Sequence, residues 1–236
     1  MQNNRKLALG SLLVFSAGLA HAADQTILGN SFLLKNPGPV DKRKVIAKAK
    51  ESASPNNIMG NPTVAGGTLT VQANGTSPSA QVFPLPQGTS PSTGKPFWSG
   101  DAVKGFKYKD PKGDNGPIKG ASIKKSGGGV FLIKVVGIGK NGVITVVPPN
   151  PGTSACAMLG LNGGDTYSVQ FAPPAQITNK GSTLFKVKKP VNEGSCIVGV
   201  TTTTSSTTTT SSSTTSTTLY GSPSRAFVER IMSLLE

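Results

Sequence analysis

The segment 127–148 limits the fold most strongly, because two runs of apolar, β-branched residues flank the pair Asn141-Gly142. Asn-Gly tolerates the positive φ angles of a type I′ turn, so the pair predicts a tight β-hairpin. The first arm, 130–138, is nearly continuously apolar apart from Lys134. Such a run is typical of a central strand that is covered on both faces. The segment therefore indicates a β protein, but it does not indicate an activity.

Short segments of alternating apolar and polar residues recur between Gly- and Pro-rich turns in the part 23–200. We expect 81–85 to be an edge strand, since Pro84 cannot donate to a sheet ladder. The segments 155–161 and 166–171 flank a Gly-rich turn and predict a second hairpin. The expected fold class is all-β, with one antiparallel β-sandwich or barrel-like domain spanning 23–200. The other predicted strands are 32–35, 44–51, 68–73, 105–109, 118–125, 183–188 and 195–200.

Two weak internal regularities raise the question of a pseudo-repeat. The pattern Phe-x-apolar-Lys-x-Pro begins at Phe32, Phe106 and Phe185. A second pattern, Gly-Thr-Ser followed by Gly-Asp, begins at Gly88 and again at Gly152. The two patterns are offset by different distances along the chain, so both a tandem duplication and coincidence stay open.

The first 22 residues have the features of a secretory signal peptide. Arg5 and Lys6 precede an apolar run that ends at Ala20-His21-Ala22, a small-x-small cleavage site. The run is shorter than the roughly 20 residues that a membrane-spanning helix needs, although an uncleaved anchor stays open. We expect cleavage near Ala22 and a secreted, periplasmic or cell-surface protein without a transmembrane span. Cleavage would remove His21, the only histidine, and with it every histidine-based catalytic or metal site.

The composition changes abruptly after Val200. The residues 201–218 are all Thr or Ser and bury no apolar surface, so we expect a disordered stalk over 201–219. The residues 220–236 predict a short amphipathic tail helix. It would begin at Ser222-Pro223 and place Phe227 and Ile231 on one face.

The chain is strongly basic, with 24 Lys and Arg against 10 Asp and Glu and a net charge of +14. The excess is mainly lysine, because Arg43, Arg225 and Arg230 are the arginines that follow the leader. Specific nucleic-acid recognition usually relies on Arg, so soluble strand edges or a general polyanion-binding surface fit better. In an oxidising compartment, Cys156 and Cys196 predict one disulfide.

A candidate ligand site lies in the segment 97–109. Phe97, Trp98 and Tyr108 could stack on sugar rings, while Lys107 and Lys109 could pair with acidic groups. The alternative is that Trp98 plugs one end of the core.

Carboxylates offer weaker candidates. Asp101 and Asp165 are the best pair for a glycosidase, although both fit turn residues better. The segment 110–116 distantly resembles a calcium loop, but Lys112 interrupts the oxygen ligands and an ordinary turn fits better. We therefore expect no catalytic residue, no metal and no cofactor.

The leading hypothesis is an exported, non-enzymatic structural or adhesive β module with a basic surface. Its partner would be an anionic or neutral polysaccharide or another cell-surface polymer, and not a specific nucleic acid. The first alternative is a carbohydrate-binding module around Trp98 and Tyr108. The second is a hydrolase that uses Asp101 and Asp165.

Overall fold

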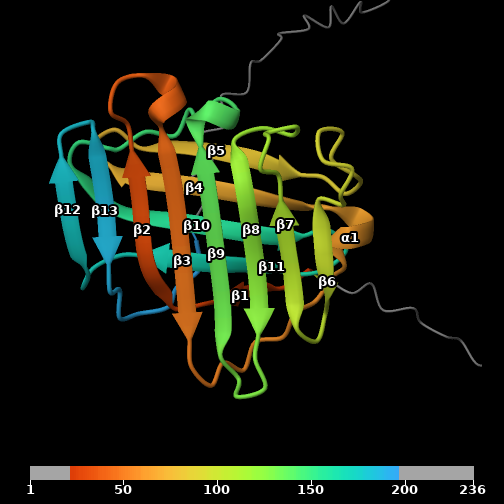
Figure 1. The fold of residues 1–236 in the computed structure, drawn as a ribbon. Helices are drawn as coiled ribbons and strands as arrows, with labels where there is room; N and C mark the ends of the chain where they lie inside the picture. Colours follow the sequence, from red (N-terminus) through yellow and green to blue (C-terminus); the bar gives the residue numbers. More distant parts are fainter. Residues whose placement is uncertain (1–21, 197–236) are drawn as a thin grey trace, which may run out of the picture. The chain divides into compact units, whose positions relative to one another are not determined.

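In a computed structural model, residues 22–196 are described and form two β-sheets packed face to face. Figure 1 shows the strands of the five-stranded sheet running across those of the eight-stranded sheet. The five-stranded sheet has the order β1 (Asp24–Thr26), β11 (Thr166–Phe171), β10 (Gly152–Leu161), β4 (Gly67–Gly75), β5 (Ser79–Leu85). The eight-stranded sheet has the order β12 (Gln176–Lys180), β13 (Leu184–Lys188), β2 (Gly29–Lys35), β3 (Lys44–Glu51), β9 (Phe131–Ile138), β8 (Ile118–Lys125), β7 (Gly105–Lys109), β6 (Trp98–Asp101).

All pairings are antiparallel except that of β1 with β11, which is parallel. The described helices are short: α1 (Pro62–Ala65) and two 3-10 turns, η1 (Val40–Lys42) and η2 (Gly139–Asn141). Among the described residues, no helix is long and apolar enough to cross a membrane. The all-β sandwich expected from the sequence is confirmed.

The core lies between the two sheets and is built from alternate residues of each strand. The ring of Phe32 in β2 contacts Phe171 in β11 at a centroid distance of 5.3 Å and Phe185 in β13 at 6.0 Å. Phe131 in β9 stacks on Tyr167 in β11 at 5.7 Å. Because strand side chains alternate between faces, burying these rings leaves the intervening residues on the outer faces.

Most of the strands predicted from alternation are confirmed. β2, β3, β4, β7 and β8 contain the predicted segments, β13 covers the predicted strand 183–188 except for Thr183, and β5 is the edge strand of its sheet. The second predicted hairpin is formed by β10 and β11. Ser195 and Cys196 are not in a strand, and the rest of the predicted strand 195–200 lies outside the described residues. Residues 1–21 of the predicted leader, the Thr/Ser tract and the predicted tail helix also lie outside them.

The hairpin predicted around Asn141-Gly142 is wrong. β9 is a central strand, but its partners are β3 and β8, so both of its edges are occupied before the chain reaches Asn141. The residues 143–147 instead follow β5, where Gln81 Nε2 donates to the Val143 carbonyl at 3.0 Å and Ser79 Oγ donates to the Val147 carbonyl at 2.8 Å.

The expectation that both faces of β9 are covered is also wrong. Leu132 is 37% exposed and Lys134 is exposed, whereas Phe131 and Ile133 are buried. One face of β9 therefore lies on the core, and the other is part of the open outer face of the sheet.

The strand arrangement favours coincidence over tandem duplication. β2 and β7, which carry Phe32 and Phe106, run in the same direction because four antiparallel pairings separate them. Their successors β3 and β8 approach the centre of the sheet from opposite sides. A tandem duplication would relate the pair β2–β3 to the pair β7–β8 by a rotation. Any such rotation would either reverse the directions of the strands or turn Phe32 and Phe106 to the outer face of the sheet. The second pattern fails as well, since Gly88 lies in a loop and Gly152 begins β10.

The expected disulfide joins Cys156 of β10 to Cys196, with a Cα–Cα distance of 5.8 Å. Cys156 alternates with the core residues Ala155 and Ala157, so it lies on the outward side of the five-stranded sheet. Gly194 packs closely on this side, because a Cβ atom there would lie 2.2 Å from Oε1 of Gln170. The end of the described chain is thus fastened over the outer side of β10 and β11.

Candidate anion-binding face

The outer face of the eight-stranded sheet carries a row of lysine and small polar residues. Each residue of the row is the direct cross-strand partner of the next, so the row crosses every strand of the sheet. We call it the central row; from β12 to β6 it consists of Gln176, Lys188, Ser31, Lys48, Lys134, Ser122, Lys107 and Ser99.

A second row lies beside it and is aliphatic in the middle. Its centre is Leu33, Ile46 and Val136, and its ends are Lys186 on β13 and Lys109 on β7. We call all outward residues of the eight-stranded sheet the lysine face. The face therefore combines the cationic central row with an aliphatic strip beside it.

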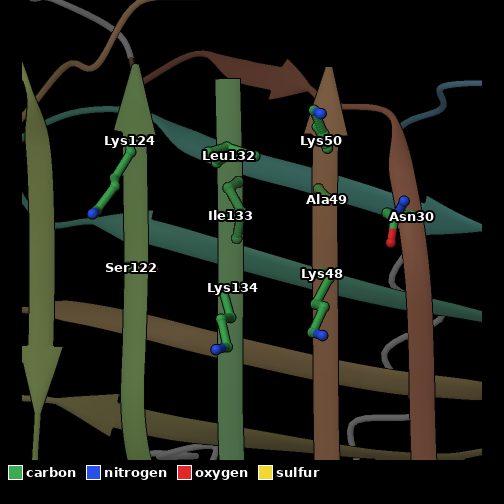
Figure 2. A pocket seen from close by; sticks show the side chains of 9 residues that line it. All are labelled: Asn30, Lys48, Ala49, Lys50, Ser122, Lys124, Leu132, Ile133 and Lys134. Atoms are coloured by element: carbon green, nitrogen blue, oxygen red, sulfur yellow. The ribbon is translucent and has the colours of Figure 1, made fainter. Parts of the chain in front are cut away.

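Figure 2 shows one of two adjoining depressions in the lysine face. Its volume is about 380 Å³, and Lys48 and Lys50 of β3, Lys134 of β9 and Lys124 of β8 surround Leu132. The second depression, about 270 Å³, lies toward β7 and is lined by Lys107 and Val136, among others.

Small residues form the junction of the two depressions. Both are lined by Ser122, and the second also reaches Gly120, whose missing side chain lowers the floor beside Lys107. Lys124 and Lys134 line both depressions as well. The two depressions thus form one shallow trough along the central row.

Repulsion between lysines dominates the electrostatics of this face. The pKa of Lys107 lies below its ordinary value, chiefly because of the positive charge of Lys109 and then because of desolvation. Lys124 and Lys134 lower it further. At the other end of the face, the charge of Lys188 is the largest cause of the lowered pKa of Lys186.

No carboxylate balances these charges at the outward positions of β12, β13, β2, β3, β9, β8 and β7. Glu51, the one acidic residue in these strands, points inward and accepts a hydrogen bond from Ser54 at 2.7 Å. Asp101 lies at the margin in β6, where its carboxylate accepts the backbone N–H groups of Val103 and Lys104. An anion that approaches the trough therefore meets uncompensated ammonium groups.

The structure divides the predicted ligand residues between two environments. Lys107 and Lys109 lie on the lysine face, but the side chains of Phe97, Trp98 and Tyr108 lie in the core, each at most 4% exposed. The ring of Tyr108 lies 5.8 Å from that of Phe97 and 5.3 Å from that of Trp98.

Trp98 Nε1 donates a hydrogen bond of 2.9 Å to the Leu85 carbonyl, so its polar atom is used internally. The rings therefore present no open face on which a sugar could stack, which corrects the expectation of an aromatic platform. The alternative, Trp98 as a core residue, is what the structure has.

The other residues of the central row were missed by the sequence analysis. Lys48, Lys134 and Lys188 each alternate with apolar neighbours, which indicates that they point outward. Alternation within a strand does not reveal which outward residues of distant strands lie side by side.

The two carboxylates proposed for a hydrolase serve turns in different sheets. Asp101 binds the turn between β6 and β7, whereas Asp165 precedes β11 and accepts the Ala23 N–H at 2.9 Å and a hydrogen bond from Gln25. Both are therefore used as turn and anchoring residues.

The segment that distantly resembles a calcium loop also uses its carboxylates internally. The fully buried Asp110 accepts the N–H groups of Gly113, Asp114 and Asn115 at 2.8–2.9 Å. The carboxylate of Asp114 accepts hydrogen bonds from Ser90 and Ser92, which hold its pKa below the ordinary value. In the part of the chain that the structure describes, no group of three His, Cys, Asp or Glu residues could hold a metal ion.

Comparisons of this chain with protein-family models, with curated proteins and with solved structures found no match.

Proposed function

We propose that the protein is an exported, non-enzymatic module that binds an anionic polysaccharide through its lysine face. The observation that supports this proposal is the in-register central row, in which Lys188, Lys48, Lys134 and Lys107 follow one another across the sheet. Lysines that only kept strand edges soluble would be expected at the edges, whereas Lys48 and Lys134 lie on the two central strands.

The spacing of the row suits a linear polymer. Neighbouring strands lie about 4.8 Å apart, so Lys48 is about 10 Å from Lys188 and Lys134 is about 10 Å from Lys107 along the sheet. The part of the row from Lys188 to Lys107 is about 24 Å long, which several sugar units with repeated negative groups could follow. A single small anion would use only part of it.

The residue types on the face favour an acidic polysaccharide over the other polymers. In the described strands β12, β13, β2, β3, β9, β8 and β7 there is no arginine, the residue best suited to guanine edges and bidentate phosphate contacts. The aromatic rings of these strands, including Phe106 and Tyr108, point into the core. Single-stranded nucleic acids and neutral sugars both rely on exposed aromatic faces, which this surface lacks.

The disulfide that fastens the end of the described chain lies away from this face. Cys196, the last described residue, is fastened to the outward side of the five-stranded sheet, whereas the lysine face is the outward side of the other sheet. The anchored end of the described chain therefore does not cover the lysine face.

The test replaces Lys48, Lys107 and Lys134 together by Gln. Its matched control replaces Lys95, Lys104 and Lys140, three exposed lysines in loops and turns, so that the net charge changes equally. If each exposed charge contributes about 0.5 kcal/mol, the central-row variant binds a sulfated polysaccharide about tenfold more weakly in calorimetry at constant salt. The control variant should bind the sulfated polysaccharide with nearly the affinity of the unsubstituted protein. Added salt should weaken the binding of all three proteins.

Three outcomes would overturn the proposal. The two triple variants could lose affinity equally, which would reduce the effect to net charge. The protein could bind a neutral polysaccharide regardless of salt. It could also bind vesicles with anionic lipids but no soluble acidic polysaccharide, which would identify a membrane surface as the partner.

A further inference from the structure

Asp165 anchors the beginning of the described chain. Its Oδ1 accepts the Ala23 N–H at 2.9 Å, and its Oδ2 accepts a hydrogen bond from the side chain of Gln25. The backbone N–H of Thr166 donates to the Ala23 carbonyl at 2.9 Å. Both carboxylate oxygens of Asp165 are therefore directed at residues 23–25.

The residues that follow Ala23 are integrated into the fold. β1 pairs in parallel with β11, and Ser168 Oγ donates to the Asp24 carboxylate at 2.6 Å. The side chain of Gln25 accepts the Asn57 N–H at 3.0 Å, and Ile27 is fully buried in the core. Ala22 and Ala23 are both exposed and precede β1, but both backbone polar groups of Ala23 are hydrogen-bonded to the turn before β11 and to its first residue. Ala23 is therefore the residue at which the described chain is attached to this sheet.

This attachment point coincides with the cleavage point that the sequence predicts after Ala22. Hydrolysis of the Ala22–Ala23 peptide bond consumes one water molecule, leaving a carboxylate on Ala22 and an α-ammonium group on Ala23. The neutral N–H that faces Asp165 in the uncleaved chain would thereby become a cation. The carboxylate acceptor makes the hydrogen bond charge-assisted before and after cleavage, and the ammonium donor adds a direct charge attraction that the neutral N–H lacks.

We propose that Asp165 is a binding site for the α-ammonium group that leader removal creates on Ala23. Processing would then strengthen the attachment of β1 to the edge of the five-stranded sheet, and the mature chain would be more stable than its precursor. This inference depends on the predicted cleavage after Ala22. It does not depend on the lysine face, which belongs to the other sheet.

The pairing has a defined pH dependence. Asp165 favours the charged amine, so the pKa of the Ala23 amino group should lie above the ordinary range of about 7.7–8.0. The added stability is fully present below that range and is lost as the pH rises through the raised value of the folded state. The other titratable groups at this site are Asp24 on β1, Tyr167 on β11 and Glu193, which accepts a hydrogen bond from Thr26.

The test compares four forms of the chain 23–236: the unsubstituted chain and the Asp165→Asn variant, each with a free amino terminus and each acetylated at Ala23. At neutral pH, the free form should melt a few degrees above the acetylated form. The difference should disappear at alkaline pH, and acetylation should have little effect in the Asp165→Asn background. The pKa of the amino group should be about one pH unit higher in the free form than in Asp165→Asn.

Asp101→Asn serves as a matched control, because it removes another turn carboxylate far along the chain from Ala23. In that background acetylation should cost as much stability as in the unsubstituted chain. The proposal fails if acetylation has no effect at neutral pH or if its effect persists in Asp165→Asn. It also fails if the amino-terminal sequence of the exported protein begins at a residue other than Ala23.

Discussion

Lys48 of β3 and Lys134 of β9 are direct cross-strand partners on the outer face of the eight-stranded sheet. Like charges that face each other on neighbouring strands are destabilising. The pKa of Lys107, the next lysine of the row, is lowered chiefly by Lys109 on its own strand and, to a smaller extent, by Lys124 and Lys134, so repulsion between lysines extends over this face. A sheet selected for stability alone would be expected to alternate charges here. The retained repulsion is therefore an argument for a binding role.

Replacing Lys134 by Ser should stabilise the body by about 0.2–1 kcal/mol, since it removes repulsion from Lys48 across one strand pair. Ser is the matched choice because Ser31 and Ser122 occupy other positions of the same row. Urea unfolding of the two proteins measures the difference. Lys104→Ser, in the turn after β6, is the control and should leave stability nearly unchanged. A loss of stability in Lys134→Ser would contradict the repulsion argument.

Alternation within segments was sufficient to predict most strands, because burying one face of a sheet imposes a period of two on the sequence. It failed at Asn141-Gly142, where the local preference for a hairpin was overridden by the pairing of β9 with β3 and β8. It also failed for the candidate site. Lys48 and Lys107 are far apart in the sequence and join one row only through the strand order, which no local pattern encodes.

Trp98 should behave as a core residue and not as a ligand-binding residue. Its fluorescence should be blue-shifted and should not change when neutral glycans are added, because the ring is 3% exposed. Trp98→Ala should destabilise the protein by about 3–5 kcal/mol. The milder Trp98→Phe should still bind an acidic polysaccharide with unchanged affinity. A fluorescence response to neutral glycans, lost on heating, would contradict this assignment.

The disulfide should contribute strongly to stability, because it links residues that are 40 positions apart. Constraining a loop of that length in the unfolded chain stabilises the fold by about 4 kcal/mol in the chain-entropy model. Urea unfolding of the Cys156→Ser, Cys196→Ser double variant, compared with the oxidised protein, measures this contribution. Reductant should destabilise the oxidised protein and leave the double variant unchanged. Equal stability of all forms would mean that the bond does not form in the folded protein.

Asp110 should be important for folding and should not respond to calcium. Its buried carboxylate accepts three backbone N–H groups, so Asp110→Asn should cost about 1–3 kcal/mol in unfolding free energy. Asp101→Asn is the matched control, since its exposed carboxylate accepts two such groups and its loss should cost less. Added calcium should not raise the melting temperature of the unsubstituted protein. A calcium-dependent rise abolished by Asp110→Asn would instead restore the interpretation of this segment as a metal loop.

The tyrosines of the core should make the protein unstable in strong alkali. Burial raises the pKa of Tyr108 and of Tyr167 to about 12. In the unfolded chain a tyrosine ionises near 10, so unfolding releases protons between these values. The stability associated with both phenols is thus fully present below about 10 and is lost as the pH rises through about 12.

Phenolate absorbance during an alkaline titration checks this directly, with and without urea. Tyr167→Phe should remove one late-titrating phenol. It should also lower stability by about 1–3 kcal/mol at neutral pH, because the hydroxyl donates to the Asn57 carbonyl and accepts the Met59 N–H. Absorbance reports the phenols directly, whereas stability in alkali also contains a contribution of opposite sign from Lys107. Deprotonation of Lys107 relieves repulsion on the lysine face and therefore raises stability. If both phenols ionised near 10 in the folded protein, Tyr108 and Tyr167 could not lie in the dry interior between the sheets.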